Sequence, residues 1–204
     1  MIETLISVIF PIPVYKAKLE RGFTAQELRF VEKMKTKCVP NAANMTSTNN
    51  YVLNNSSFAT LKKEIDLFIK DYFSKILFPP KTISPYITQS WLNYTEPKGS
   101  HPKHRHLNSY LSGVLYINAD KAHDTITFEH DRYDQINLPT TEWNSFNSNS
   151  WSFPVESGDI VIFPSRLPHL VTKKKGKNTR VSLSFNVFVK GNLGKASDLT
   201  ELRI

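Results

Sequence analysis

From residue 85 to near its end, the chain consists of short runs rich in β-branched and aromatic residues, separated by turn-forming residues. Such runs are typical of strands, and the turn residues mark their ends. No long helical period interrupts them, so helices crossing between parallel strands are not expected. We therefore predict an antiparallel sandwich or barrel. Its strands are expected at 86–94, 110–118, 124–129, 159–163, 168–172 and 180–189.

The first 80 residues contain two helical patterns. Thr24 and Glu27 have the spacing of a capping box, which predicts a helix over 24–38. Its expected apolar face is Leu28, Val31 and Met34. A second helix is predicted from a four-and-three apolar spacing and ends before Pro79 and Pro80. Its apolar residues are Leu61, Ile65, Phe68, Ile69, Tyr72 and Ile76.

The other N-terminal segments predict an edge strand and a loop. Residues 5–19 alternate loosely and contain two prolines, as an edge strand does. Residues 41–57 are rich in Asn, Ser and Thr, which favour loops. We expect the helices to support the sheet, so that 1–204 is one domain, with a supporting part over 1–80 and a β-rich core over 81–204.

Residues 131–152 form a long polar insertion that holds four aromatic side chains. Loops of this length inside a compact domain are usually functional. We therefore expect this segment to be a lid or a wall of a substrate site.

Charge and cysteine content limit the classes of partner. The formal charge is +8, and its densest run, "KKKGK" at 173–177, predicts a solvated hairpin turn. No nucleic-acid-binding signature accompanies it, so nucleic acid is not an expected partner. The single cysteine, Cys38, excludes an internal disulfide and fits a reducing compartment. No apolar run reaches 18 residues, so no membrane span is expected and we predict a cytoplasmic protein.

Three of the six histidines lie within residues 101–106. His104 and His106 are two apart, which in an extended strand places both imidazoles on one face, where they could share a metal ion. His169, at the start of an apolar strand, is the expected distant third ligand, and His101 is the local competitor. Solvated histidines and one histidine in the core remain the alternative interpretation.

The strand at 180–189 has one apolar face and one polar face. Arg180 and Ser182 lie on the polar face, and a planar guanidinium beside a hydroxyl could clamp a carboxylate. A polar face that simply meets water is the alternative. The polar residues are Arg180, Ser182, Ser184 and Asn186, and the apolar ones are Val181, Leu183, Phe185 and Val187.

Five stretches together resemble the Fe(II)- and 2-oxoglutarate-dependent dioxygenases. More narrowly, they resemble a family of small oxygenases found in bacteria and in phages of marine cyanobacteria. In chain order they are "LISVIFPIPVY", "WLNY", "HRHLNSYLSGVLYIN", "SGDIVIFPSRLPH" and "RVSLSFNVFVKG". The resemblance covers nearly the whole chain.

The resemblance implies a double-stranded β-helix, a jelly roll related to cupins, buttressed by the two N-terminal helices. It implies Fe(II) and 2-oxoglutarate as cofactors, with decarboxylation of 2-oxoglutarate coupled to hydroxylation of a C–H bond. A prolyl or similar side chain is the substrate expected by analogy, in a bacterial or phage-infected cell. The implied metal ligands are His104, His106 and His169. The residues implied for the 2-oxoglutarate pocket are Arg180 with Ser182, and then Tyr116 and Asn93.

One position departs from the wider superfamily, which places Asp or Glu where His106 stands. Three neutral imidazoles leave an Fe(II) site one negative charge short, which favours other metals such as zinc or nickel. Alternatively, His106 stands off and a carboxylate such as Glu129 approaches the metal. The rival to an enzyme is a cupin-like binding module with a basic surface for an acidic partner. Such a module has no need of Arg180 and Ser182 beside the metal.

Overall fold

The computed structural model describes residues 2–130 and 138–204, and its strands form two facing sheets and one small pair. The larger sheet has the order β1 (Tyr15–Lys18), β9 (Asp159–Pro164), β6 (Leu111–Asn118), β11 (Arg180–Lys190), β4 (Ser84–Thr95), β3 (Asn44–Ser47) and β2 (Cys38–Asn41). The smaller sheet has the order β5 (His101–His104), β10 (His169–Val171), β7 (Thr125–Glu129) and β8 (Ser150–Pro154). The small pair is β12 (Asn192–Leu193) with β13 (Leu202–Arg203).

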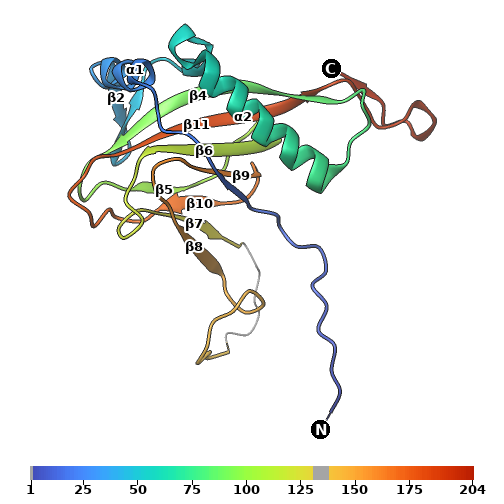
Figure 1. Cartoon of the computed structure of the whole chain (residues 1–204). Coiled ribbons are helices and arrows are strands. Elements are labelled where there is room, and N and C mark those ends of the chain that lie inside the picture. Colours follow the sequence, from blue (N-terminus) through green and yellow to red (C-terminus); the bar gives the residue numbers. More distant parts are fainter. Residues whose placement is uncertain (1, 131–137) are drawn as a thin grey trace.

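The chain passes back and forth between the two sheets. Strands β4, β6, β9 and β11 belong to the larger sheet, whereas β5, β7, β8 and β10 belong to the smaller one. All pairs among these strands are antiparallel. This alternation is how a double-stranded β-helix winds, and Figure 1 shows the two sheets stacked with the smaller one below. The predicted antiparallel β class is confirmed.

The helices cover the face of the larger sheet that points away from the smaller sheet (Figure 1). They are α1 (Ala25–Lys35) and α2 (Ala59–Tyr72), and a π-helical turn, Phe73–Leu77, continues α2. Leu61 and Ile65 of α2 and Leu183 and Phe185 of β11 are fully buried in one apolar cluster. Because side chains alternate along a strand, the polar face of β11 must point toward the smaller sheet. The helices therefore decide which face of β11 is left for chemistry.

The capping box of α1 is confirmed, but its buried face differs from the prediction. The Thr24 hydroxyl accepts from the Glu27 backbone N–H at 3.2 Å, and the Glu27 carboxylate accepts from the Thr24 N–H at 2.7 Å. The predicted core residue Leu28 is 43% exposed, and Phe30 is buried instead. Glu27 is buried because Arg21 donates to both of its oxygens, at 2.9 and 2.8 Å. This ion pair lets α1 turn a carboxylate inward.

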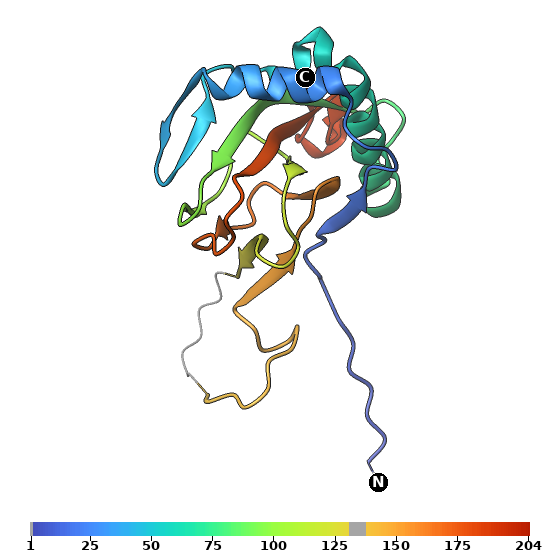
Figure 2. The same ribbon diagram turned by 60° about the vertical axis from the view of Figure 1, so that its left-hand side comes forward.

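The predicted loop at 41–57 was wrong in part, because it contains strand β3 and two short 3-10 turns, Val52–Asn54 and Ser56–Phe58. Met45 and Thr46 pair with Tyr94 and Asn93 of β4. Pairing with a long neighbouring strand overrides the local loop preference of Asn and Ser. The predicted edge strand at 5–19 is present only over Tyr15–Lys18, and residues 2–10 extend away from the body of the protein (Figures 1 and 2).

The basic run at 173–177 is not a solvated hairpin turn, because it joins β10 of one sheet to β11 of the other. Lys174 is only 4% exposed, and its ammonium lies 3.0 Å from a carboxylate oxygen of Asp124. The same ammonium donates to the Asn178 side-chain oxygen at 2.8 Å. A buried lysine is accommodated when a charge of opposite sign is buried beside it.

The long polar insertion is only partly described. Residues 131–137 lie outside the described residues, and β8 begins at Ser150, so the predicted loop ends earlier than expected. Among the described residues, no helix is long and apolar enough to cross a membrane.

Candidate metal centre

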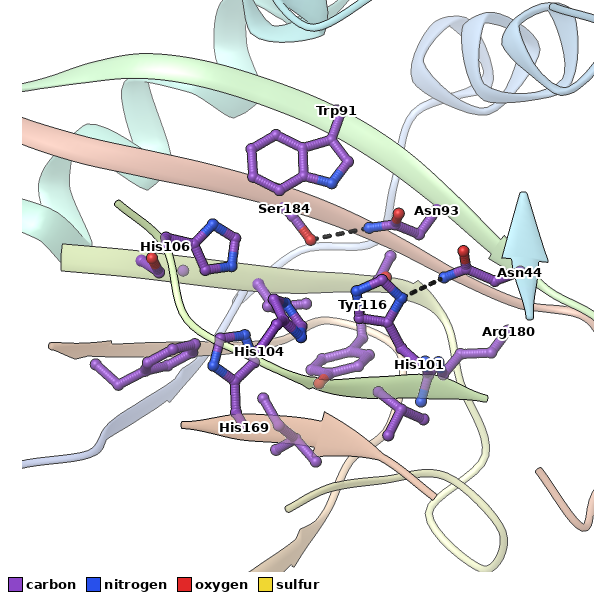
Figure 3. Close-up of a pocket in the computed structure, with 17 residues that line it drawn as sticks. Asn44, Trp91, Asn93, His101, His104, His106, Tyr116, His169, Arg180 and Ser184 are labelled. Carbon is purple, nitrogen blue, oxygen red and sulfur yellow. Dashed lines mark hydrogen bonds between the residues drawn. The ribbon is translucent and has the colours of Figure 1, made fainter. Parts of the chain in front are cut away.

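A cavity of about 60 Å³ lies between the two sheets, and both sheets line it (Figure 3). The smaller sheet contributes histidines from β5 and β10. The larger sheet contributes the polar face of β11 and its neighbours on β4 and β6. All seven side chains that the sequence singled out for a site line this one cavity. They are Asn93, His104, His106, Tyr116, His169, Arg180 and Ser182.

Strand register brings the histidines together. His104 and His169 are direct partners in the antiparallel pair of β5 with β10, and their ring centroids are 4.2 Å apart. His106 lies two residues beyond the end of β5, where its backbone N–H donates to the Ser165 carbonyl at 3.1 Å. Potential ligand atoms of His104, His106 and His169 all lie within 4.8 Å of one another. Three side chains from two strands and a turn thus face one point.

Two of these imidazoles are held with a nitrogen lone pair free for a metal. The Nδ1 of His104 lies 2.8 Å from the Pro102 carbonyl oxygen, and the Nδ1 of His169 lies 3.1 Å from that of Leu167. A carbonyl oxygen can only accept, so each Nδ1 carries the hydrogen and each Nε2 is bare. Hydrogen bonds of this kind fix the orientation of metal-binding histidines. His106 stacks on Trp91, with ring centroids 5.6 Å apart.

Burial keeps the three imidazoles neutral. Desolvation lowers the pKa of His106 to about 4 and that of His169 to about 3, and it also lowers the pKa of His104. Neighbouring imidazoles add to the lowering for His106 and His169. Metals bind the neutral form of histidine, so the cluster is in its binding form at neutral pH.

The cluster contains no carboxylate among the residues that the structure describes. Glu129, the alternative ligand, instead forms an ion pair with Lys103 at 2.8 Å. A divalent ion held by three neutral imidazoles keeps its full positive charge. An anionic ligand in the cavity would offset that charge.

Arg180 supplies a positive charge to the cavity. Its side chain is buried, and its hydrogen bonds to the described residues are long, 3.4 Å from Nη1 to the Thr125 carbonyl and 3.4 Å from Nη2 to the Thr95 hydroxyl. Its Nε has no partner, and no described carboxylate forms an ion pair with it. A buried guanidinium without a counter-charge is costly, so the cavity suits an anion.

One row of side chains across the larger sheet lies beside Arg180. Asn93 of β4, Ser182 of β11 and Tyr116 of β6 are register partners, and all three are buried. The Asn93 amide donates to the Ser184 hydroxyl at 3.0 Å, which leaves its carbonyl oxygen without a partner. Burial raises the pKa of Tyr116 to about 12, so its phenol is protonated at neutral pH. The row offers both donors and acceptors to a polar ligand.

The residues of this cavity that sequence reasoning did not assign to the site include His101, as a wall residue, and Asn44. His101, expected only as a local competitor for the metal, begins β5 and lines the cavity. Asn44 lay in the segment predicted to be a loop. Neither residue has a local pattern that distinguishes it, since both are placed by pairing with distant strands.

Comparison with protein families finds a match to part of the chain. Residues 89–186 match the family described as "Putative 2OG-Fe(II) oxygenase". The matched segment is similar to this family over just under half of the chain. The matched segment contains His104, His106, His169 and Arg180. A search of the curated proteins finds no match.

Solved structures share the fold of this chain. An oxidoreductase of the 2OG-Fe(II) oxygenase family from Burkholderia pseudomallei has a TM-score of 0.55 at 14% identity, covering 84% of this chain and 83% of its own. HygX from Streptomyces hygroscopicus, crystallised with nickel, 2-oxoglutarate and hygromycin B, has a TM-score of 0.59 at 11% identity (86% and 82%). A prolyl-4-hydroxylase from Pseudomonas putida has a TM-score of 0.54 at 12% identity (86% and 92%). The predicted double-stranded β-helix is confirmed.

Proposed function

We propose that the chain is an Fe(II)- and 2-oxoglutarate-dependent hydroxylase in which His104, His106 and His169 hold the iron. The observation that carries the proposal is the convergence of one ring nitrogen from each of these histidines to within 4.8 Å of the others. In His104 and His169 the Nδ1 atom lies against a backbone carbonyl, which leaves Nε2 for the metal. Core histidines in a merely structural role need no such convergence. The backbone carbonyls of Pro102 and Leu167 would keep the ligands oriented when the metal leaves.

Arg180 is proposed to anchor the far carboxylate of 2-oxoglutarate, with Ser182 as a second donor. The support is the buried guanidinium, whose Nε has no partner and which has no described counter-charge. Tyr116 and Asn93, neighbours of Ser182 in the sheet, are proposed to line the same pocket. When bound, iron and 2-oxoglutarate supply the oxidative chemistry, while the chain positions them and excludes water.

His106 in place of a carboxylate gives the proposed site a specific property. The protein ligands carry no negative charge, so the carboxylate of 2-oxoglutarate would be the first anion to reach the metal. Metal and 2-oxoglutarate should therefore bind cooperatively, each raising the affinity for the other by the same factor.

The substrate that we propose is a prolyl or similar side chain. Its support is analogy with the prolyl-4-hydroxylase that shares the fold. We further propose that residues 1–204 act as one domain, because the larger sheet takes β1, β2 and β3 from the first 80 residues. The segment 131–152, of which 131–137 lie outside the described residues, is proposed as a lid or a wall of the substrate site.

Succinate formation tests the proposal. The protein would be reconstituted with Fe(II) without oxygen, and then given O₂ and 2-oxoglutarate. We expect succinate that depends on Fe(II), and none from a His169→Ala variant. A wild-type protein that forms no succinate, together with a His169→Ala variant that keeps its metal, would instead favour the non-catalytic cupin-like module.

A further inference from the structure

A fourth imidazole faces the cavity without being part of the three-histidine cluster. His101 begins β5, and its ring centroid is 4.3 Å from that of His104. Figure 3 shows its ring between the cluster and Arg180, with one nitrogen toward Asn44 and the other toward the cluster. The ring is therefore close enough to contact a ligand held between the metal and Arg180.

The Nδ1 atom of His101 accepts a hydrogen bond, whereas the Nδ1 atoms of the proposed ligands His104 and His169 donate one. His104 and His169 each direct Nδ1 at a carbonyl oxygen, which can only accept. His101 directs Nδ1 at the amide nitrogen of Asn44, 3.3 Å away, and an amide nitrogen can only donate. The Nδ1 of His101 must therefore accept, which leaves its hydrogen on Nε2, the nitrogen that faces the cluster.

Asn44 is well placed to impose this polarity. It begins β3, which is paired with β4, and its side chain is buried against the cavity. It lies two residues before Thr46, the partner of Asn93, so it shares the cavity face of the sheet with that residue. The fold thus presents a donor to His101 from a strand outside the histidine segment.

We propose that Asn44 holds His101 as the Nε2–H tautomer, so that His101 donates to a carboxylate ligand of the cavity and stays out of the metal's coordination. The inference rests on the proposed function for the identity of the metal site. Asn44 is a positioning residue, since it acts through His101. The carboxylate would lie between the His101 N–H and the Arg180 guanidinium, two donors that share the cavity.

The tautomer of His101 matters because it determines whether this imidazole can coordinate the metal and fill a position that substrate would need. A bare Nε2 on His101 could add a fourth imidazole to the three, and four nitrogen ligands suit a structural zinc site. A catalytic site must keep positions free for substrate. One amide hydrogen bond would therefore separate an open three-histidine site from a closed four-histidine site.

Histidine tautomers can be read directly by long-range ¹H–¹⁵N NMR of the metal-free, ¹⁵N-histidine-labelled protein. We expect His101 as Nε2–H, and His104 and His169 as Nδ1–H, with the His101 signals assigned by their loss in His101→Gln. A wild-type His101 with its hydrogen on Nδ1 would overturn the inference. This NMR measurement requires neither a variant of Asn44 nor catalytic activity.

An Asn44→Asp variant reverses the polarity with little change of shape, because its carboxylate accepts from Nδ1. We expect the His101 hydrogen to move to Nδ1. Added to the metal-free variant, Zn(II) should bind about tenfold more tightly than to the wild type. Added Co(II) should give the stronger visible absorption of a four-nitrogen tetrahedral site.

Two controls separate coordination from charge. Asn41→Asp adds the same charge at the register partner of Asn44 and should leave zinc affinity unchanged. The double variant Asn44→Asp with His101→Gln should lose the gain in zinc affinity, and persistence of the gain would overturn the inference. If the wild type forms no succinate but these tautomer and metal results hold, only the proposed function fails. If succinate forms and Asn44→Asp leaves the tautomer unchanged, only this inference fails.

Discussion

His104 and His169 are 65 positions apart in sequence, yet they are direct partners across β5 and β10, with ring centroids 4.2 Å apart. The candidate metal centre is thus a property of strand register. A slip of one residue would send one of the two imidazoles to the opposite face of the sheet. Each ring is then fixed by its own backbone carbonyl contact, so register and tautomer together define the site.

Removal of one proposed ligand should abolish tight metal binding. The His169→Ala variant leaves two imidazoles, and we expect Ni(II) affinity, measured by calorimetry without oxygen, to fall by more than about 100-fold. The matched control is His123→Ala, because that histidine is 48% exposed and lies outside the cluster. Equal losses in both variants would show that the cluster is not the metal site.

Arg180→Gln should weaken 2-oxoglutarate binding and spare the metal. The substitution removes the buried guanidinium, and loss of one partner of a buried charge pair typically costs about 2 kcal/mol or more. We therefore expect the Kd for 2-oxoglutarate on the Ni(II)-loaded protein to rise by about 30-fold or more. Arg166→Gln, at an exposed arginine, is the control and should bind normally. A normal Kd for Arg180→Gln would remove this residue from the pocket.

Gly113→Ala should destabilise the fold through the core rather than the cavity. Gly113 lies opposite Phe185 in the pair of β6 with β11, and an added Cβ would overlap that aromatic ring. Overpacking of this kind costs about 1–3 kcal/mol in the free energy of unfolding, measurable by urea denaturation. Gly22→Ala is the control, since nothing lies within 4 Å of its added Cβ. An unchanged urea midpoint for Gly113→Ala would contradict the packing described.

Stability should depend on pH through Glu27. Burial raises the pKa of this carboxyl, but the ion pair with Arg21 and the Thr24 N–H outweigh it, so the pKa is lower than its ordinary value. A depressed folded-state pKa adds stability above the unfolded-state value, and this stability is lost as pH falls through the folded pKa. Below about pH 4.5, the advantage of the wild type over Glu27→Gln in the free energy of unfolding should shrink. A pH-independent difference would contradict this account.

The sequence predicts the parts of the fold that have a local periodicity. The β-rich runs from 86 to 189, the capping box at Thr24 and the apolar stripe of α2 are all present in the structure. The alternation of apolar and polar residues along β11 indicated which face of the strand packs in the core and which lines the cavity. These features depend on neighbours in sequence, which is why they could be read from it.

Other features depend on partners far along the chain. Strand β3 exists because it pairs with β4, and Lys174 is buried because Asp124 meets it across 50 positions. His101 joins the cavity through the same kind of long-range pairing, opposite Val171. None of these partnerships has a signature within a short window of sequence.

Joint binding of iron and 2-oxoglutarate tests the central claim most directly. The Fe(II)-loaded protein would be titrated with 2-oxoglutarate without oxygen, while the visible charge-transfer absorption of the chelated pair is followed. The account predicts a saturable band in the wild type, no band in His169→Ala, and a band that needs more 2-oxoglutarate in Arg180→Gln. A wild-type protein that holds Fe(II) but develops no band at saturating 2-oxoglutarate would contradict it.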